Sequence, residues 1–219
     1  SNKLVLANAN VSGGAALIVN AALQNNGASA VRLEKSGPGD VRLIGPASHT
    51  GGTAINAGAL SVDVPASVVR DMPAGTISGN GGLIKTGDGT LAFPNSGNTY
   101  AGTTLVSRGT ARVLHNATFG STAAPTVVQD GGALDFRGSA ANTLRLGSEH
   151  VYATGAGPDG NGALLNTGAY SQYWALSYVT LLGDLTVGGS QRLDLRGDNA
   201  TQTYMNLNGH GITKKGTSL

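Results

Sequence analysis

The string "GGLIKTGDGTLAFPNSGNTYAGTTLVSRGTARV" runs from Gly81 to Val113. Four short apolar segments in it, GLIK, TLAF, TTLV and TARV, are separated by the turn-forming strings TGDG, PNSGNTYAG and SRG. Glycine reaches positive φ without steric cost, so the glycine-rich strings are typical of turns. The apolar segments are too short for helices and carry β-forming residues. The string therefore predicts four short strands joined by tight corners.

The same pattern occurs again before and after this stretch. Residues 31–62 align with it at an offset of 50, which becomes 51 after one added residue near Pro94. A third, incomplete copy begins at Gly211 and covers residues 211–219. The matched positions are Lys35 with Lys85, Gly37 with Gly87, Gly39 with Gly89, Val41 with Leu91, Gly51 with Gly102, Thr53 with Thr104, Gly58 with Gly109 and Val62 with Val113, and in the third copy Ile212, Lys214, Gly216 and Leu219 replace Leu83, Lys85, Gly87 and Leu91. An internal repeat of this kind favours a solenoid over a sandwich or a barrel.

One copy of the repeat is not expected to fold by itself, and stacking of several copies removes the obstacle. A single copy leaves its apolar face and its backbone polar groups unpaired, whereas stacked coils bury the first and pair the second. We expect an all-β parallel β-helix over residues 1–219, about nine or ten coils of roughly 20–25 residues, with the repeated segments one above another. Helical spacing is almost absent, and the best candidate, Ala66 to Met72, covers about two turns.

The residues from Gly82 to Val113 resemble the autotransporter-associated β-strand repeat found in passenger domains of bacterial autotransporters. The family pattern is Gly-Leu-x-Lys-x-Gly-x-Gly-x-Leu, then Asn-x-Tyr-x-Gly-x-Thr, then Gly-Thr-Leu-x-Val. Ala111 departs from it, and in the weaker copy Pro38 lies in the turn and His49 takes the tyrosine position. The resemblance implies a right-handed, single-stranded parallel β-helix, presented at the bacterial surface. It also implies a C-terminal outer-membrane β-barrel outside these residues.

Composition narrows the function classes. Charged residues make up 12% and the formal net charge is +2, so the chain lacks the clustered cations that bind nucleic acid. Cysteine is absent, which excludes disulfides and thiolate metal sites. No short-spaced histidine pair or known catalytic motif occurs, and we expect no cofactor and no metal. We read the chain as a fragment of a longer protein.

Several residue groups could still carry function. Arg196-Gly197-Asp198 is a candidate adhesive tripeptide if an exposed turn presents it. Asp194 and Arg196 should share the outer face of a strand, with Leu193 and Leu195 inward. Tyr170, Tyr173, Trp174 and Tyr178 form an aromatic concentration that could stack sugar rings or cover the core.

Glycine spacing also produces two weak motifs. Gly155, Gly157 and Gly160 match a dinucleotide-loop spacing, but a strand-like segment follows instead of the helix that such a loop needs. Asp159 lies in a single partial match to a calcium-binding nonapeptide. Such nonapeptides bind calcium only when several copies are stacked. Neither motif predicts a site.

These observations favour a non-enzymatic, adhesive segment of a secreted passenger, monomeric as a fragment and touching host-cell, extracellular-matrix or glycan components. The alternative is a β-helical carbohydrate-active enzyme, a polysaccharide lyase or hydrolase, which would align acidic, basic and aromatic side chains along one groove. A third reading is a viral or phage fibre, which would be trimeric.

Overall fold

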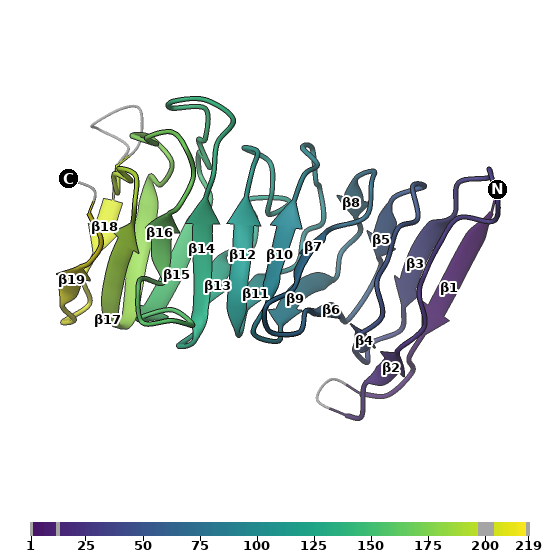
Figure 1. The fold of residues 1–219 in the computed structure, drawn as a ribbon. Helices are drawn as coiled ribbons and strands as arrows, with labels where there is room; N and C mark the ends of the chain where they lie inside the picture. Colours follow the sequence, from purple (N-terminus) through teal and green to yellow (C-terminus); the bar gives the residue numbers. More distant parts are fainter. Residues whose placement is uncertain (1, 12–13, 197–203, 218–219) are drawn as a thin grey trace.

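A computed structural model describes residues 2–11, 14–196 and 204–217. Its regular elements in these ranges are all strands, and they stack as a β-solenoid (Figure 1). In the same ranges no helix is long and apolar enough to cross a membrane. The all-β solenoid expected from the repeat is confirmed.

The strands form three faces that run along the rod. The first face contains β1 (Lys3–Ala7), β3 (Arg32–Ser36), β5 (Thr53–Ile55) and β8 (Ile77–Ser78). The second contains β2 (Leu17–Val19), β4 (Val41–Leu43), β6 (Ala59–Asp63), β9 (Gly82–Thr86), β11 (Thr104–Val106), β13 (Thr126–Val128), β15 (His150–Gly155), the start of β17 (Tyr178–Gly189) and β18 (Tyr204–Asn206). The third contains β7 (Val69–Asp71), β10 (Thr90–Phe93), β12 (Gly109–Val113), β14 (Gly132–Phe136), β16 (Leu164–Asn166), the end of β17 and β19 (Ile212–Lys214).

All the pairings between these strands are parallel, so each turn of the chain lies on the preceding one. Register partners are as few as 19 residues apart, from Val41 to Leu60, and as many as 30, from Leu134 to Leu164. The long turns in the C-terminal half reduce the number of coils to about eight, below the nine or ten expected. At about 4.8 Å per coil the stack is roughly 40 Å long.

The repeat copies do not lie one above another, which corrects the expected register. Copy one starts on the first face with β3, whereas copy two starts on the second face with β9. The third copy starts on the third face with β19. Stacking occurs inside each copy instead, with β3 on β5 and β9 on β11. Residues 64–80 contain β7 on the third face and β8 on the first, so copy two begins one face later than copy one.

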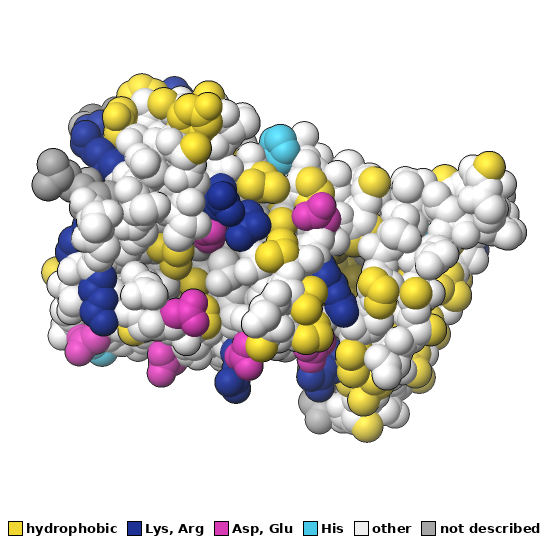
Figure 2. Space-filling model, in the orientation of Figure 1, with side chains coloured by type: hydrophobic (Ala, Val, Ile, Leu, Met, Phe, Trp, Pro, Cys, Tyr) yellow, Lys and Arg dark blue, Asp and Glu magenta, His cyan; other side chains and the backbone are white. Residues whose placement is uncertain are grey.

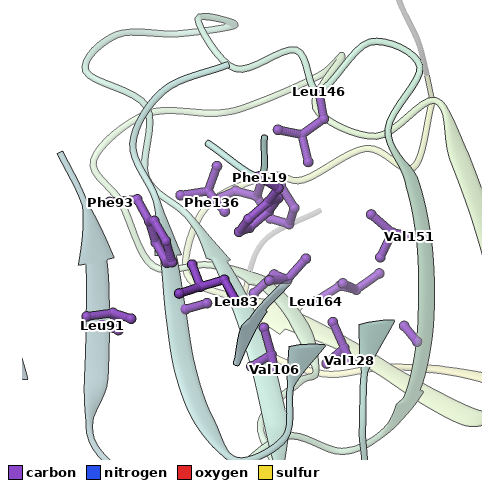
Figure 3. Packing of buried hydrophobic residues seen from close by; sticks show 14 of the residues in the cluster. Leu83, Leu91, Phe93, Val106, Phe119, Val128, Phe136, Leu146, Val151 and Leu164 are labelled. Carbon is purple, nitrogen blue, oxygen red and sulfur yellow. The ribbon is translucent and has the colours of Figure 1, made fainter. Parts of the chain in front are cut away.

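The core is a continuous apolar column inside the three faces. Its side chains come from inward positions of successive strands, and large ones gather in the middle coils (Figure 3). Phe93 and Phe119 pack edge to face with ring centroids 5.7 Å apart. Phe136, Leu134 and Leu164 are fully buried beside them. The apolar segments between the glycine corners therefore fill the core, as their pattern predicts.

The segment with the best helical spacing is a strand. Val69–Asp71 forms β7, which pairs with β10 through Val69–Thr90, Arg70–Leu91 and Asp71–Ala92. Met72 is 3% exposed and packs into the core. Backbone pairing along the stack therefore overrides the weak local preference of Ala66 to Met72.

The aromatic position of the repeat has the same role in both copies. Tyr100 is fully buried, and its hydroxyl is hydrogen-bonded to Thr104 Oγ1. His49 is also buried, and its Nε2 lies 3.1 Å from Thr53 Oγ1. The smaller ring borders a cavity of about 20 Å³ lined by Leu43, which stands where copy two has Phe93. His49 Nδ1 has no hydrogen-bond partner among the described residues.

We expect His49→Tyr to raise the free energy of unfolding by about 1 kcal/mol at neutral pH, because the larger ring fills the cavity and removes the unpaired nitrogen. Burial lowers the pKa of His49 below its ordinary 6.5. The imidazole of His49 therefore binds a proton more readily in the unfolded chain than in the folded chain. The free energy of unfolding consequently decreases as the pH falls below 6.5. The gain from His49→Tyr should thus be larger at about pH 5.5 than at about pH 7.5, measured by urea denaturation. Tyr100→His is the mirror variant and should be destabilised; a gain independent of pH would contradict the role of His49.

Candidate functional site

The repeat motif builds a junction around a buried lysine. Lys85 ends the inward side of β9 and is 1% exposed. Its Nζ donates to the carbonyl oxygens of Thr86 and Gly87, each at 2.7 Å, and of Arg108 in the next coil at 3.0 Å. Gly87 takes a positive φ of 73°, which turns the chain back over the ammonium group. The lysine thereby joins two coils. Thr86 O also accepts a hydrogen bond from Val64 N, whereas the carbonyls of Gly87 and Arg108 have Lys85 as their hydrogen-bond donor among the described residues.

The other copies repeat this junction. Lys35 is fully buried and donates to Gly37 O and Ala57 O, each at 2.6 Å, with Ser36 O at 3.4 Å. Lys214 makes the two local bonds, to Lys215 O at 2.8 Å and Gly216 O at 3.4 Å, and is exposed. All three aligned lysines make the local bonds, but in the described ranges only Lys35 and Lys85 also reach the next coil. The last position of the third copy, Leu219, lies outside the described residues. Burial lowers the pKa of Lys85 to about 8 and also lowers that of Lys35.

The acidic segment near residue 194 is an ion-pair cluster on the surface. Arg192 Nε and Arg196 Nε lie 2.7 and 3.1 Å from the two carboxylate oxygens of Asp194. Leu193 makes one parallel bridge to Gln172 and, with Leu195, packs against the core. The predicted inward and outward sides are therefore correct, although the segment pairs at a single residue and forms no full strand.

The tripeptide Arg196-Gly197-Asp198 is only partly described. Arg196 also donates from Nε to Tyr173 O at 3.2 Å, so its guanidinium is engaged at the surface. Gly197 and Asp198 lie outside the described residues. The adhesive role of the tripeptide stays a prediction.

The aromatic concentration separates into different sites. The guanidinium of Arg145 lies 4.5 Å from the ring centroid of Trp174, and that of Arg192 lies 4.4 Å from the ring of Tyr173. Tyr178 is instead close to His150, with ring centroids 6.2 Å apart. Tyr170 lies at the rim of a groove on the third face. The structure therefore does not bring the four rings into one platform.

The second face carries an aromatic column that the sequence did not reveal. His150 stacks on Tyr152 at 4.5 Å and meets the edge of Tyr204 at 6.3 Å. Its Nε2 lies 2.9 Å from Thr180 Oγ1. The register of β15, β17 and β18 aligns His150, Tyr178 and Tyr204, which are far apart in sequence. Identifying this column requires the strand register of β15, β17 and β18, and the sequence did not predict that register.

The glycine motif at residues 155–160 is followed by a strand and not by a helix. Gly155 ends β15, and Gly157 and Gly160 form a loop with positive φ values of 76° and 68°. The described residues after this loop form β16, so the helix N-terminus needed for a pyrophosphate is absent there. Within the described ranges, no group of three His, Cys, Asp or Glu side chains includes Asp159 or could hold a metal ion.

Glu149 is a buried acid that the sequence reading did not single out. It is 4% exposed and accepts a 2.7 Å hydrogen bond from Thr126 Oγ1. It lines a pocket with Phe119, Arg145 and Leu146. Burial, which outweighs the hydrogen bonds from Thr126, raises the pKa of Glu149 from 4.5 to about 7.

The raised pKa predicts a loss of stability in mild alkali. The folded chain keeps the Glu149 proton where the unfolded chain has released it, so stability is complete below about pH 4.5 and is lost as the pH rises through about 7. Glu149→Gln mimics the protonated acid and should be more stable than the wild type by about 2 kcal/mol at about pH 8.5, and nearly equal to it at about pH 4.5. Urea denaturation at the two pH values checks this. Equal free energies of unfolding for the wild type and Glu149→Gln at about pH 8.5 would show that ionisation of Glu149 does not destabilise the folded chain.

Comparison with known protein families agrees with the junction geometry. Residues 33–62 and 83–110 match the model of the passenger-associated-transport-repeat family. Searches of curated proteins and of solved structures returned no match. The two matched ranges contain Lys35 and Lys85 together with the aromatic positions, so the family match covers the residues that make the junctions.

Proposed function

Because the chain carries two passenger-associated transport repeats on a β-solenoid and so fits a segment of an autotransporter passenger, we propose that it is an adhesive, non-enzymatic rod at the bacterial surface. The observation that carries this proposal is the pair of matched repeats, whose buried lysines join successive coils. The side chains of the repeat motif thus serve the scaffold, and the outward surfaces remain for contact with host-cell, matrix or glycan components.

The parallel stack also suits export. Each folded coil offers strand edges with unpaired N–H and C=O groups to which the next coil can bond, so folding can proceed along the rod one coil at a time. A folded coil cannot slide back through a narrow pore, which would favour outward movement. In this proposal the chain is secreted or surface-exposed, is held through a C-terminal outer-membrane barrel elsewhere in the protein, and is monomeric as a fragment.

Adhesion can be measured directly with the purified chain. Beads coated with it should attach to cultured epithelial cells or to immobilised matrix proteins, and soluble chain should compete for this attachment. Asp198→Ala tests the contribution of Arg196-Gly197-Asp198. Attachment no greater than that of albumin-coated beads on every surface would refute the adhesive role.

The enzyme alternative has its own readout. If the chain were a polysaccharide lyase or hydrolase, incubation with acidic and neutral polysaccharides would release unsaturated uronates or new reducing ends. We expect neither product.

A further inference from the structure

A groove on the third face combines basic, acidic and aromatic side chains. One row of outward side chains crosses the strands in register, from Asp71 on β7 through Ala92 on β10 and Arg112 on β12 to Asp135 on β14. Figure 2 shows basic side chains over this face, with an acidic side chain across a hydrophobic strip from them. The groove is lined by Asp71, Ala92, Arg112, Leu114, Arg137, Gly138, Gly168, Ala169 and Tyr170.

Arg112 makes a long ion pair with one acid and no hydrogen bond through its side chain in the described part of the chain. Its nearest acid is Asp135, whose Oδ2 lies 3.5 Å from Arg112 Nε. Asp135 accepts hydrogen bonds from Thr167 instead, from the backbone N at 2.9 Å and from Oγ1 at 2.8 Å. Arg112 Nε is buried and has no hydrogen-bond partner in the described part of the chain. The carboxylate therefore pairs with the guanidinium by charge. No described residue accepts a hydrogen bond from its terminal N–H groups, which are the donors that could reach a ligand because Nε is buried.

Arg137 adds a second guanidinium group to the groove. It follows β14 directly and lines the same groove. No described residue makes a hydrogen bond or an ion pair with its side chain. Two adjacent guanidinium groups with unused donors are suited to a carboxylate or a sulfate, which they can bind through paired hydrogen bonds.

The rim of the groove is fixed in place. Thr167 is held by Asp135, and the carbonyl oxygen of Tyr170 accepts a 2.9 Å hydrogen bond from Asn166 Nδ2. Tyr170 is 47% exposed. Three small residues, Gly138, Gly168 and Ala169, line the same groove. An exposed aromatic side chain at a groove lined partly by small residues is an arrangement on which a sugar ring can stack.

We propose that this groove binds an anionic polysaccharide, with Arg112 and Arg137 on its carboxylate or sulfate groups and Tyr170 on a sugar ring. Asp71, on the opposite wall, would accept hydrogen bonds from sugar hydroxyls. The inference rests on the proposed adhesive function, for which it names the ligand class. It requires no reaction at the groove.

Biolayer interferometry with the purified chain tests the proposal against three polymers. Polygalacturonate presents carboxylates, heparin presents sulfates as well, and dextran is neutral. We expect binding of at least one anionic polymer and none of dextran. Arg137→Gln should weaken that binding about tenfold, since each charge-assisted hydrogen bond contributes on that scale, and Tyr170→Ala should weaken it as well.

Arg108→Gln is the matched control. Arg108 is 66% exposed, pairs with Asp88 and lies outside the groove, and its substitution removes the same charge. It should change the affinity less than twofold. Arg112→Gln is secondary, because its loss also leaves Asp135 without its ion pair; urea denaturation identifies any variant that fails to fold.

The outcomes separate this inference from the proposed function. Equal losses in Arg137→Gln and Arg108→Gln would indicate diffuse charge attraction and overturn the groove, as would binding of dextran or of no polymer. Bead adhesion would in those cases still support the adhesive role. Groove-dependent polymer binding without adhesion to any cell or matrix would support the groove and refute the adhesive role. The polymer that responds to Arg137→Gln identifies the anion as carboxylate or sulfate.

Discussion

Lys85→Met is expected to lower the free energy of unfolding by at least about 2 kcal/mol. Methionine keeps the apolar stem but removes the N–H donors. The carbonyl oxygens of Gly87 and Arg108 are then left without a donor in a buried corner, while Thr86 O keeps its hydrogen bond from Val64 N. Each unpaired buried acceptor costs about 1–3 kcal/mol. Urea denaturation followed by circular dichroism measures the loss.

Lys214→Met is the control for this variant. Lys214 ends a strand of the same pattern and donates to its two local carbonyls, but it is exposed, so water can replace it. Its substitution should cost no more than about 0.5 kcal/mol. Lys35→Met should resemble Lys85→Met, because Lys35 makes the equivalent bonds in the first copy. Similar costs for Lys85→Met and Lys214→Met would mean that the junction contributes little to stability.

Gly109→Ala should lower the free energy of unfolding by about 3–5 kcal/mol. Gly109 has a positive φ of 71°, and a Cβ there would overlap the carbonyl oxygens of Gly87 and Gly89 and approach Lys85 Nζ. The variant combines backbone strain with a clash inside the junction. The same denaturation experiment measures it.

Gly131→Ala separates these two contributions. Gly131 has a positive φ of 86°, but a Cβ there meets nothing within 4 Å. It should therefore cost only the backbone strain, about 1–2 kcal/mol. If Gly131→Ala were as damaging as Gly109→Ala, the clash at the junction would be irrelevant.

Much of the local fold could be predicted from the repeat pattern. The strings TGDG and SRG are corners, and the segments between them are β9, β10, β11 and β12. The sequence alignment of the first two copies also paired the lysine positions and the aromatic positions correctly, because the surroundings of each depend on a few neighbouring residues. The rotation between copies could not be predicted, since it depends on how residues 64–80 fold, and their strand β7 is set by pairing with β10.

The candidate sites were predictable to a smaller extent. Asp194 and its two arginines are close in sequence, so their cluster could be expected. The groove residues Asp71, Arg112 and Tyr170 come from separate coils, and only the strand register and the fold of the connecting loops bring them together. Burial of Glu149 likewise follows from packing between coils rather than from its sequence neighbours.

The rotation of the repeat copies has a mechanical consequence. The lysine of copy one fastens the corner between the first and second faces, that of copy two the corner between the second and third, and Lys214 lies at the end of the third face. If all the lysines that join coils lay along one edge of the rod, coils could separate at the opposite edge under a sideways force. Here the two buried lysines, Lys35 and Lys85, lie on different edges, so a separation of coils that starts along either of those edges meets a lysine that joins two coils.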